Sequence, residues 1–275
     1  MLITPNFVLL NMPKTGSTFA RTVLKAIHEE RAEQRSTASE LIELILPSPT
    51  APGRPADQHG TYRQIPSDHA HKPIVSIARN LYGKFLSTYR FGFWAVHPPL
   101  PIDTLRSKFP HFPDLSFDEY VEMNLISGIG KVPNNERLLI GNQTIQFISM
   151  YCRNPEAVIA GLSFDDETSL RLILSDLGNV RFLRCGKVNN DMANYLAEFG
   201  YSPAEVVFCR HHPPVNAAPA SNADPAQVWT PIALDYVRRN ERLLLAVFSA
   251  LGITDEFACV PRATRRVSNE NLSRW

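Results

Sequence analysis

The feature that most constrains the fold is an apolar run near the start of the chain that leads directly into a turn and a helical pattern. The run 7–11 (Phe-Val-Leu-Leu-Asn) predicts a buried strand, because it is short, apolar and bounded by turn residues. The following loop contains Lys14 and Gly16, and the apolar spacing predicts a helix over 17–33, capped by Ser17 or Thr18. This order of strand, tight loop and helix is typical of α/β folds.

The rest of the chain continues the alternation of strands and helices. Two further buried strands are predicted at 73–78 and 180–183. Helices are predicted at 81–93, 117–125, 143–151, 170–177, 191–199 and 231–251, and Pro-rich loops at 47–55, 96–113 and 211–224. We therefore expect one α/β domain over residues 1–275, with a central parallel sheet flanked by helices.

Composition and charge argue against several classes of function. The formal net charge is +1, so no global field favours nucleic acid or a membrane surface as a partner. No apolar run reaches the roughly 18 residues of a membrane-spanning helix. The four cysteines are widely spaced and form no metal-ligand or disulfide pattern, so a cytoplasmic setting is expected.

The first loop has the properties of a phosphate-binding site. A helix N-terminus after a strand presents free N–H groups and the positive end of the helix dipole. Gly16 allows close approach of the backbone, Lys14 adds a positive charge, and Ser17 and Thr18 add hydroxyl donors. The loop is not a Walker A motif, because Lys14 precedes the glycine and no upstream glycine exists. A plain turn with a surface lysine remains the alternative.

A second candidate anion site follows the second predicted strand. Arg79 stands at its end, and Ser87 lies eight positions later, about two turns along the predicted helix. An arginine fork binds two phosphate oxygens. A helix-capping arginine and a surface serine would explain the pair equally well in isolation. Beside the first loop the anion site is favoured, since ligands bind at the carboxyl ends of strands in open α/β sheets.

These two elements resemble those of sulfotransferases that use 3′-phosphoadenosine-5′-phosphosulfate (PAPS). The segment 13–18 (Pro-Lys-Thr-Gly-Ser-Thr) is similar to their 5′-phosphosulfate loop, and 77–89 is similar to their 3′-phosphate element. The resemblance implies a single-domain, P-loop-NTPase-like sulfotransferase fold, PAPS as donor, 3′-phosphoadenosine 5′-phosphate (PAP) as product, and no metal. It assigns the 5′-phosphate and bridging oxygen to Lys14, the phosphosulfate cradle to Thr15, Gly16, Ser17 and Thr18, and the 3′-phosphate to Arg79 and Ser87.

Three further segments resemble the Golgi-type carbohydrate sulfotransferases and their bacterial relatives. They are 115–121, 142–147 and 239–242, so that the resemblance spans about residues 5–255. The Golgi enzymes carry a membrane anchor, and no such anchor is expected here, because the sequence contains no apolar run of that length. The implied acceptor is a hydroxyl or amine of a saccharide or of a small metabolite. The Pro-rich segments 47–66 and 95–113 are expected to shape its pocket.

Sulfuryl transfer also needs a base for the acceptor proton, and histidine suits this because its pKa lies near neutrality. His59 precedes Arg79 by 20 residues, as the catalytic histidine does in many sulfotransferases. A plain loop histidine is the alternative. His69 and His71 lack a third metal ligand nearby. Weaker candidates for ligand contacts are His211, His212, Asn216, Arg262, Arg265 and Arg266.

Two other functions remain open from the sequence. A P-loop nucleotide or small-molecule kinase would bind ATP with Mg²⁺ through a Walker-type lysine, which the sequence does not contain. A non-catalytic nucleotide-binding protein would bind the nucleotide without turnover.

Overall fold

The sheet at the centre of the chain is mixed. The computed structural model describes residues 1–47, 56–127, 132–133, 137–215 and 228–253. Its five strands have the order β3-β1-β2-β4-β5. Strands β2 (Val8–Leu10), β4 (Ile74–Ala78) and β5 (Val180–Arg184) run parallel, which confirms the three predicted strands.

The expectation of a parallel sheet is therefore only partly met. The short strands β1 (Leu2–Ile3) and β3 (Ile42–Glu43) pair antiparallel and are additional to the predicted strands. Strand β1 turns directly back into β2, and the turn is closed by Thr4, whose N–H and hydroxyl both donate to Phe7 O at 2.9 Å. A connection this short can join only antiparallel strands.

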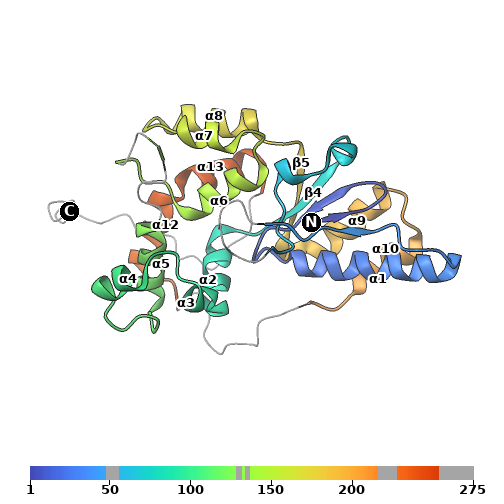
Figure 1. The fold of residues 1–275 in the computed structure, drawn as a ribbon, viewed down its shortest axis with the longest axis horizontal. Coiled ribbons are helices and arrows are strands. Elements are labelled where there is room, and N and C mark those ends of the chain that lie inside the picture. Colours follow the sequence, from blue (N-terminus) through green and yellow to red (C-terminus); the bar gives the residue numbers. More distant parts are fainter. Residues whose placement is uncertain (48–55, 128–131, 134–136, 216–227, 254–275) are drawn as a thin grey trace.

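Helices cover both faces of the sheet (Figure 1). On one face, Leu9, Val75 and Ile77 pack against α1 (Ser17–Arg35) and α9 (Val188–Glu198). On the other, Val8, Leu10 and Ile74 pack into a larger core formed by the remaining helices. The alternation along β2 is the two-residue period of a strand buried on both sides.

The larger core is built from helices that lie between β4 and β5 in sequence and after α10 (Pro203–His211). These helices are α2 (Leu81–Phe91), α3 (Phe93–Val96), α4 (Ile102–Lys108), α5 (Phe117–Ile126), α6 (Asn142–Tyr151), α7 (Pro155–Ala160), α8 (Asp166–Asp176), α12 (Pro231–Asn240) and α13 (Arg242–Ala250). Three short 3₁₀ turns complete the described elements: η1 (Tyr62–Gln64), η2 (Ser67–His69) and η3 (Cys185–Lys187). Within the described ranges, no helix has both the length and the apolar character needed to cross a membrane.

Several helical segments differ from the sequence prediction, and one of them is α7, which is additional to the predicted helices. The loop expected at 96–113 contains α4, in which Leu105 is fully buried. The helix α10 (Pro203–His211) is additional to the predicted helices, although Ser202 and Glu205 form a capping box before and within it. The helix predicted over 231–251 is two helices, which are interrupted at Glu241.

The side chain of Glu241, at the interruption, is bound to another helix. Its buried carboxylate accepts hydrogen bonds from the N–H groups of Gln143 at 2.9 Å and Thr144 at 2.8 Å, and from the Thr144 hydroxyl at 2.7 Å. It thus neutralises the N-terminus of α6, where a Cβ at Gly141 would overlap it. Burial raises the pKa of Glu241, and these hydrogen bonds and the charge of Lys84 oppose that rise.

Lys84 of α2 is a second buried charged group, and it interacts electrostatically with Glu241. It is 4% exposed, and its ammonium donates to Gln146 Oε1 at 2.8 Å. Burial lowers the pKa of Lys84 to about 7, and the attraction of Glu241 limits the fall. Two buried charges on α2 and the α12–α13 junction therefore depend on each other.

We expect Glu241→Gln to reduce the free energy of unfolding by about 3–5 kcal/mol, because it weakens the three hydrogen bonds to a buried carboxylate and places an amide NH₂ against N–H donors. Urea denaturation followed by circular dichroism measures this change. The matched control is Glu167→Gln, which removes an exposed ion pair with Arg171 and should cost less than about 1 kcal/mol. Equal losses in both variants would contradict the role of the buried carboxylate.

Candidate functional site

The loop between β2 and α1 has the backbone conformation of an anion cradle. Lys14 has φ 62° and Gly16 has φ 90°, both left-handed. For a non-glycine residue this conformation costs about 1–2 kcal/mol. Among the described non-glycine residues only Ser36 shares it, and Ser36 ends a helix, where the conformation is common. Left-handed residues in a tight turn direct successive N–H groups to one side, which makes a concave site for an anion.

The hydroxyl groups of the loop mainly hold its shape. Thr15 Oγ1 and Ser17 Oγ donate to the same acceptor, Met12 O, at 2.9 and 3.1 Å, and both side chains are buried. The cap of α1 is Gly16, with no side-chain hydrogen bond, and not Ser17 or Thr18 as predicted. Phe19 N–H donates to Gly16 O at 3.0 Å, so the N–H groups of Ser17 and the half-buried Thr18 are the ones left as donors for a ligand.

Gly16 is required here for its conformation and for space. A Cβ at this position would lie 3.2 Å from Cys185 Sγ, at the end of β5. The carboxyl ends of β2 and β5 thus approach each other at the loop. The proximity of Cys185 to the loop could not be predicted from the sequence, because it depends on the order of the strands in the sheet.

Arg79 lies against the loop, as its position after β4 predicts. Its Nη1 donates to Lys14 O at 3.3 Å. Burial lowers the pKa of Lys14, and the nearby charge of Arg79 lowers it further. Two cations held this close favour an anion between or beside them.

The last turns of α2 also face the loop. The Lys14 ammonium lies 3.7 Å from the centre of the Phe91 ring. Ser87 is half-buried and lies four residues before Phe91, so both side chains are on the same face of α2. Two of the predicted ligand residues, Lys14 and Arg79, are therefore in contact, and Ser87 lies one helical turn from the Phe91 ring that Lys14 also contacts. The contact of Phe91 with Lys14 could not be predicted from the sequence, since an aromatic residue near a helix end does not by itself indicate a site.

His59 is fixed to the start of the same loop. Its Nδ1 lies 2.7 Å from Asn11 O, and its N–H donates to Asp57 Oδ1 at 2.6 Å. The segment is also tied by Asn11 Nδ2, which donates to Gln58 O at 3.3 Å. Because a carbonyl oxygen only accepts, Nδ1 carries the proton, and Nε2 of the neutral ring is an acceptor. This is the tautomer that a general base requires.

His212 lies at the opposite end of the loop, beside the first turn of α1. Its ring meets Phe19 edge-on at 5.7 Å and Phe208 of α10 at 5.3 Å. Asn189 holds this end of α10 by donating to His212 O at 2.8 Å. His211 is exposed at the end of α10. The predicted contacts Asn216, Arg262, Arg265 and Arg266 lie outside the described residues.

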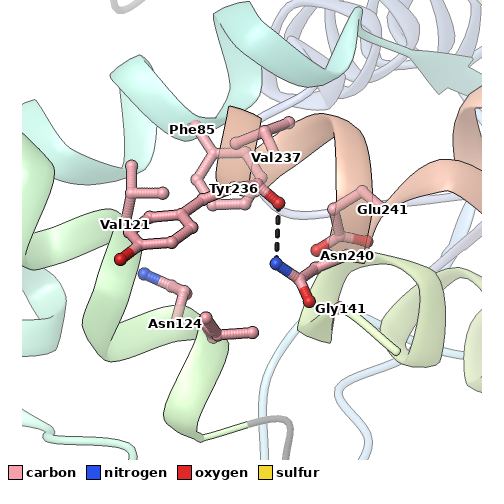
Figure 2. Close-up of a pocket in the computed structure, with 9 residues that line it drawn as sticks. Phe85, Val121, Asn124, Gly141, Tyr236, Val237, Asn240 and Glu241 are labelled. Atoms are coloured by element: carbon pink, nitrogen blue, oxygen red, sulfur yellow. Dashed lines mark hydrogen bonds between the residues drawn. The ribbon is translucent and has the colours of Figure 1, made fainter. Parts of the chain in front are cut away.

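Two small pockets adjoin α2. One lies beside the loop. It is lined by aromatic residues of the core and by Met12, Thr15, Arg79 and Lys84. The other is shown in Figure 2, where Phe85 of α2, Asn124 of α5 and the α12–α13 junction at Glu241 surround it. There Asn240 Nδ2 donates to Tyr236 O at 2.7 Å, within α12. The residues of the loop do not line this second pocket.

No protein-family model, curated protein or solved structure matches this chain.

Proposed function

We propose that the protein is a PAPS-dependent sulfotransferase. The observation that carries the proposal is the convergence of three groups at one loop. The first is the loop with left-handed Lys14 and Gly16, which leads into the N-terminus of α1. The second is the contact of Arg79 with Lys14 O, and the third is His59, whose Nε2 is the acceptor in the neutral ring. A donor with phosphates at both its 5′ and 3′ positions would bind its 5′-phosphate in this loop and its 3′-phosphate through Arg79 and Ser87. A P-loop-like sulfotransferase fold is the finer form of this proposal, and the parallel order of β2, β4 and β5 is compatible with it.

The proposed reaction is an in-line displacement at sulfur. A bond forms between an acceptor oxygen or nitrogen and sulfur, while the bond from sulfur to the bridging phosphate oxygen breaks. His59 Nε2 takes the acceptor proton, and the electron pair of the broken bond remains on PAP, where the Lys14 ammonium stabilises it. No group of the protein changes its oxidation state. The acceptor is a hydroxyl or amine of a small metabolite or saccharide.

The nucleoside would extend towards the other end of the loop. An adenine ring requires an apolar, planar surface near the phosphates. His212 and the 41% exposed ring of Phe208 provide one beside the first turn of α1. This arrangement leaves the opposite end, at Asn11 and Lys14, for the acceptor.

Nucleotide binding tests the proposal directly. PAP at 100 times its Kd should stabilise the protein by about 2.7 kcal/mol, which raises Tm by roughly 5–10 °C in a chain of this size. ATP with Mg²⁺ should have little effect. Incubation with PAPS and a panel of hydroxyl and amine acceptors, followed by mass spectrometry, should then show PAP and a product heavier by one sulfuryl group.

The same experiments distinguish the two alternatives. Stabilisation by ATP with Mg²⁺ but not by PAP would indicate a kinase. Stabilisation by PAP without turnover of any acceptor would indicate a non-catalytic nucleotide-binding protein.

A further inference from the structure

Next to Lys14 the surface carries a row of exposed rings to which the proposed reaction assigns no role. We name Phe91, Phe93 and His97 the ring row. Phe91 is 61% exposed and Phe93 41% exposed, and Val96 beside them is 75% exposed. Large apolar side chains clustered at this exposure on one surface usually mark a binding site.

The rings are arranged in sequence away from the Lys14 ammonium. Phe91 lies under the ammonium at 3.7 Å. Phe93 is stacked on Phe91 with 6.2 Å between ring centres and 19° between planes, and His97 follows at 4.2 Å from Phe93. The three rings therefore form one continuous surface that begins at the proposed reaction centre.

The local fold maintains this exposure. Gly92 has φ 68° and ends α2, so that the chain turns at once into α3. Trp94 of α3 then anchors the turn by stacking on Tyr89 and contacting Tyr120 in the core. Phe93 and Val96 share the opposite face of α3, because they are three residues apart, and His97 follows directly after the helix. Gly92 thus sets the two stacked phenyl rings next to each other on the outside.

The ring row lies beside the Lys14 ammonium, and this position connects it with the acceptor of the proposed reaction. In an in-line displacement the acceptor atom lies on the far side of sulfur from the bridging oxygen, which the Lys14 ammonium contacts in the proposed complex. An acceptor whose reactive atom reaches that sulfur can extend its ring system to Phe91, which lies against the same ammonium. We infer that the ring row binds the acceptor, and that the acceptor carries its hydroxyl on a flat, apolar ring system. This inference rests on the proposed sulfotransferase function.

The chemistry of the row favours an apolar ring over a sugar. Phe91, Phe93 and Val96 offer no hydrogen bonds from their side chains, and His97 alone adds a polar edge. A sugar exposes several hydroxyl groups, which a specific site pairs with polar side chains. A fused aromatic alcohol such as 2-naphthol needs only stacking surface and one polar contact at its reactive hydroxyl.

Kinetics with paired acceptors test the inference. We expect PAPS-dependent turnover of 2-naphthol, with a kcat/KM at least about tenfold above that of methyl β-glucoside. Phe93→Ala should raise the KM for 2-naphthol about three- to tenfold, because one stacked ring is lost, and should leave PAP affinity unchanged. Phe164→Ala is the matched control, since Phe164 is a 66% exposed phenylalanine away from the row and should change neither value.

Two results would overturn the inference: turnover of sugars but not of aromatic alcohols, or a KM for 2-naphthol that Phe93→Ala leaves unchanged. A direct measurement separates it from failure of the proposed function. Binding of 2-naphthol, followed by its fluorescence with and without PAP, does not require turnover. Weaker binding to Phe93→Ala supports the ring row even in a protein that transfers no sulfuryl group, and absence of binding to the wild type excludes it.

Discussion

Replacing His59 with alanine is expected to lower kcat by about 10²–10⁴-fold, the usual contribution of a positioned general base. The Nδ1 of the ring lies 2.7 Å from Asn11 O, which orients the ring and leaves Nε2 as the acceptor in its neutral form. The methyl group of alanine cannot take the proton from the acceptor. The rate of PAP formation from PAPS and a saturating acceptor measures the loss.

PAP affinity separates a catalytic effect from a structural one. His59→Ala should bind PAP as tightly as the wild type, because the proposed nucleotide contacts lie on Lys14, Arg79 and the start of α1. His71→Ala is the control, since His71 is exposed on a turn before β4 and should keep full activity. Full activity of His59→Ala would exclude this residue as the base.

Replacing Lys14 with methionine is expected to lower kcat by about 10²–10³-fold, the typical cost of removing one group that stabilises developing negative charge. Methionine keeps an unbranched apolar side chain over Phe91 and removes only the ammonium. Unlike His59→Ala, this variant should also bind PAP more weakly, because the charge contacts the phosphate in both the bound donor and the product.

The control for this second variant is Lys25→Met on α1, which loses an ion pair with Glu43 at the surface and should retain activity. Isothermal calorimetry with PAP and single-turnover kinetics with PAPS measure the two effects separately. Unchanged kcat together with weaker PAP binding would assign Lys14 to nucleotide binding alone.

Local sequence patterns predict the part of the fold that carries the site. The strands β2, β4 and β5 are short apolar runs, and α1 and α2 follow two of them with clear helical spacing. Each of these signals depends on residues adjacent in the chain. For the same reason the sequence alone is sufficient to place Lys14 and Arg79 at one edge of the sheet.

The features that could not be predicted depend on contacts between distant segments. The predicted helix is interrupted at Glu241, whose carboxylate binds the N-terminus of α6, about 100 residues earlier in the chain. The helix α4 has few apolar residues and is retained by Leu105 in the core. Phe91 and Cys185 approach the loop only because α2 and β5 are placed beside it.

The hydrogen bonds from Thr15 and Ser17 to Met12 O have a consequence for the kinetics of binding. Because one carbonyl holds both hydroxyl groups, the loop has its curved shape before any anion arrives. A nucleotide then binds without the conformational entropy loss of ordering a flexible loop, which would cost about 1–2 kcal/mol for each backbone residue fixed. Association should accordingly follow a single concentration-dependent phase, without a slow rearrangement of the loop after the first encounter.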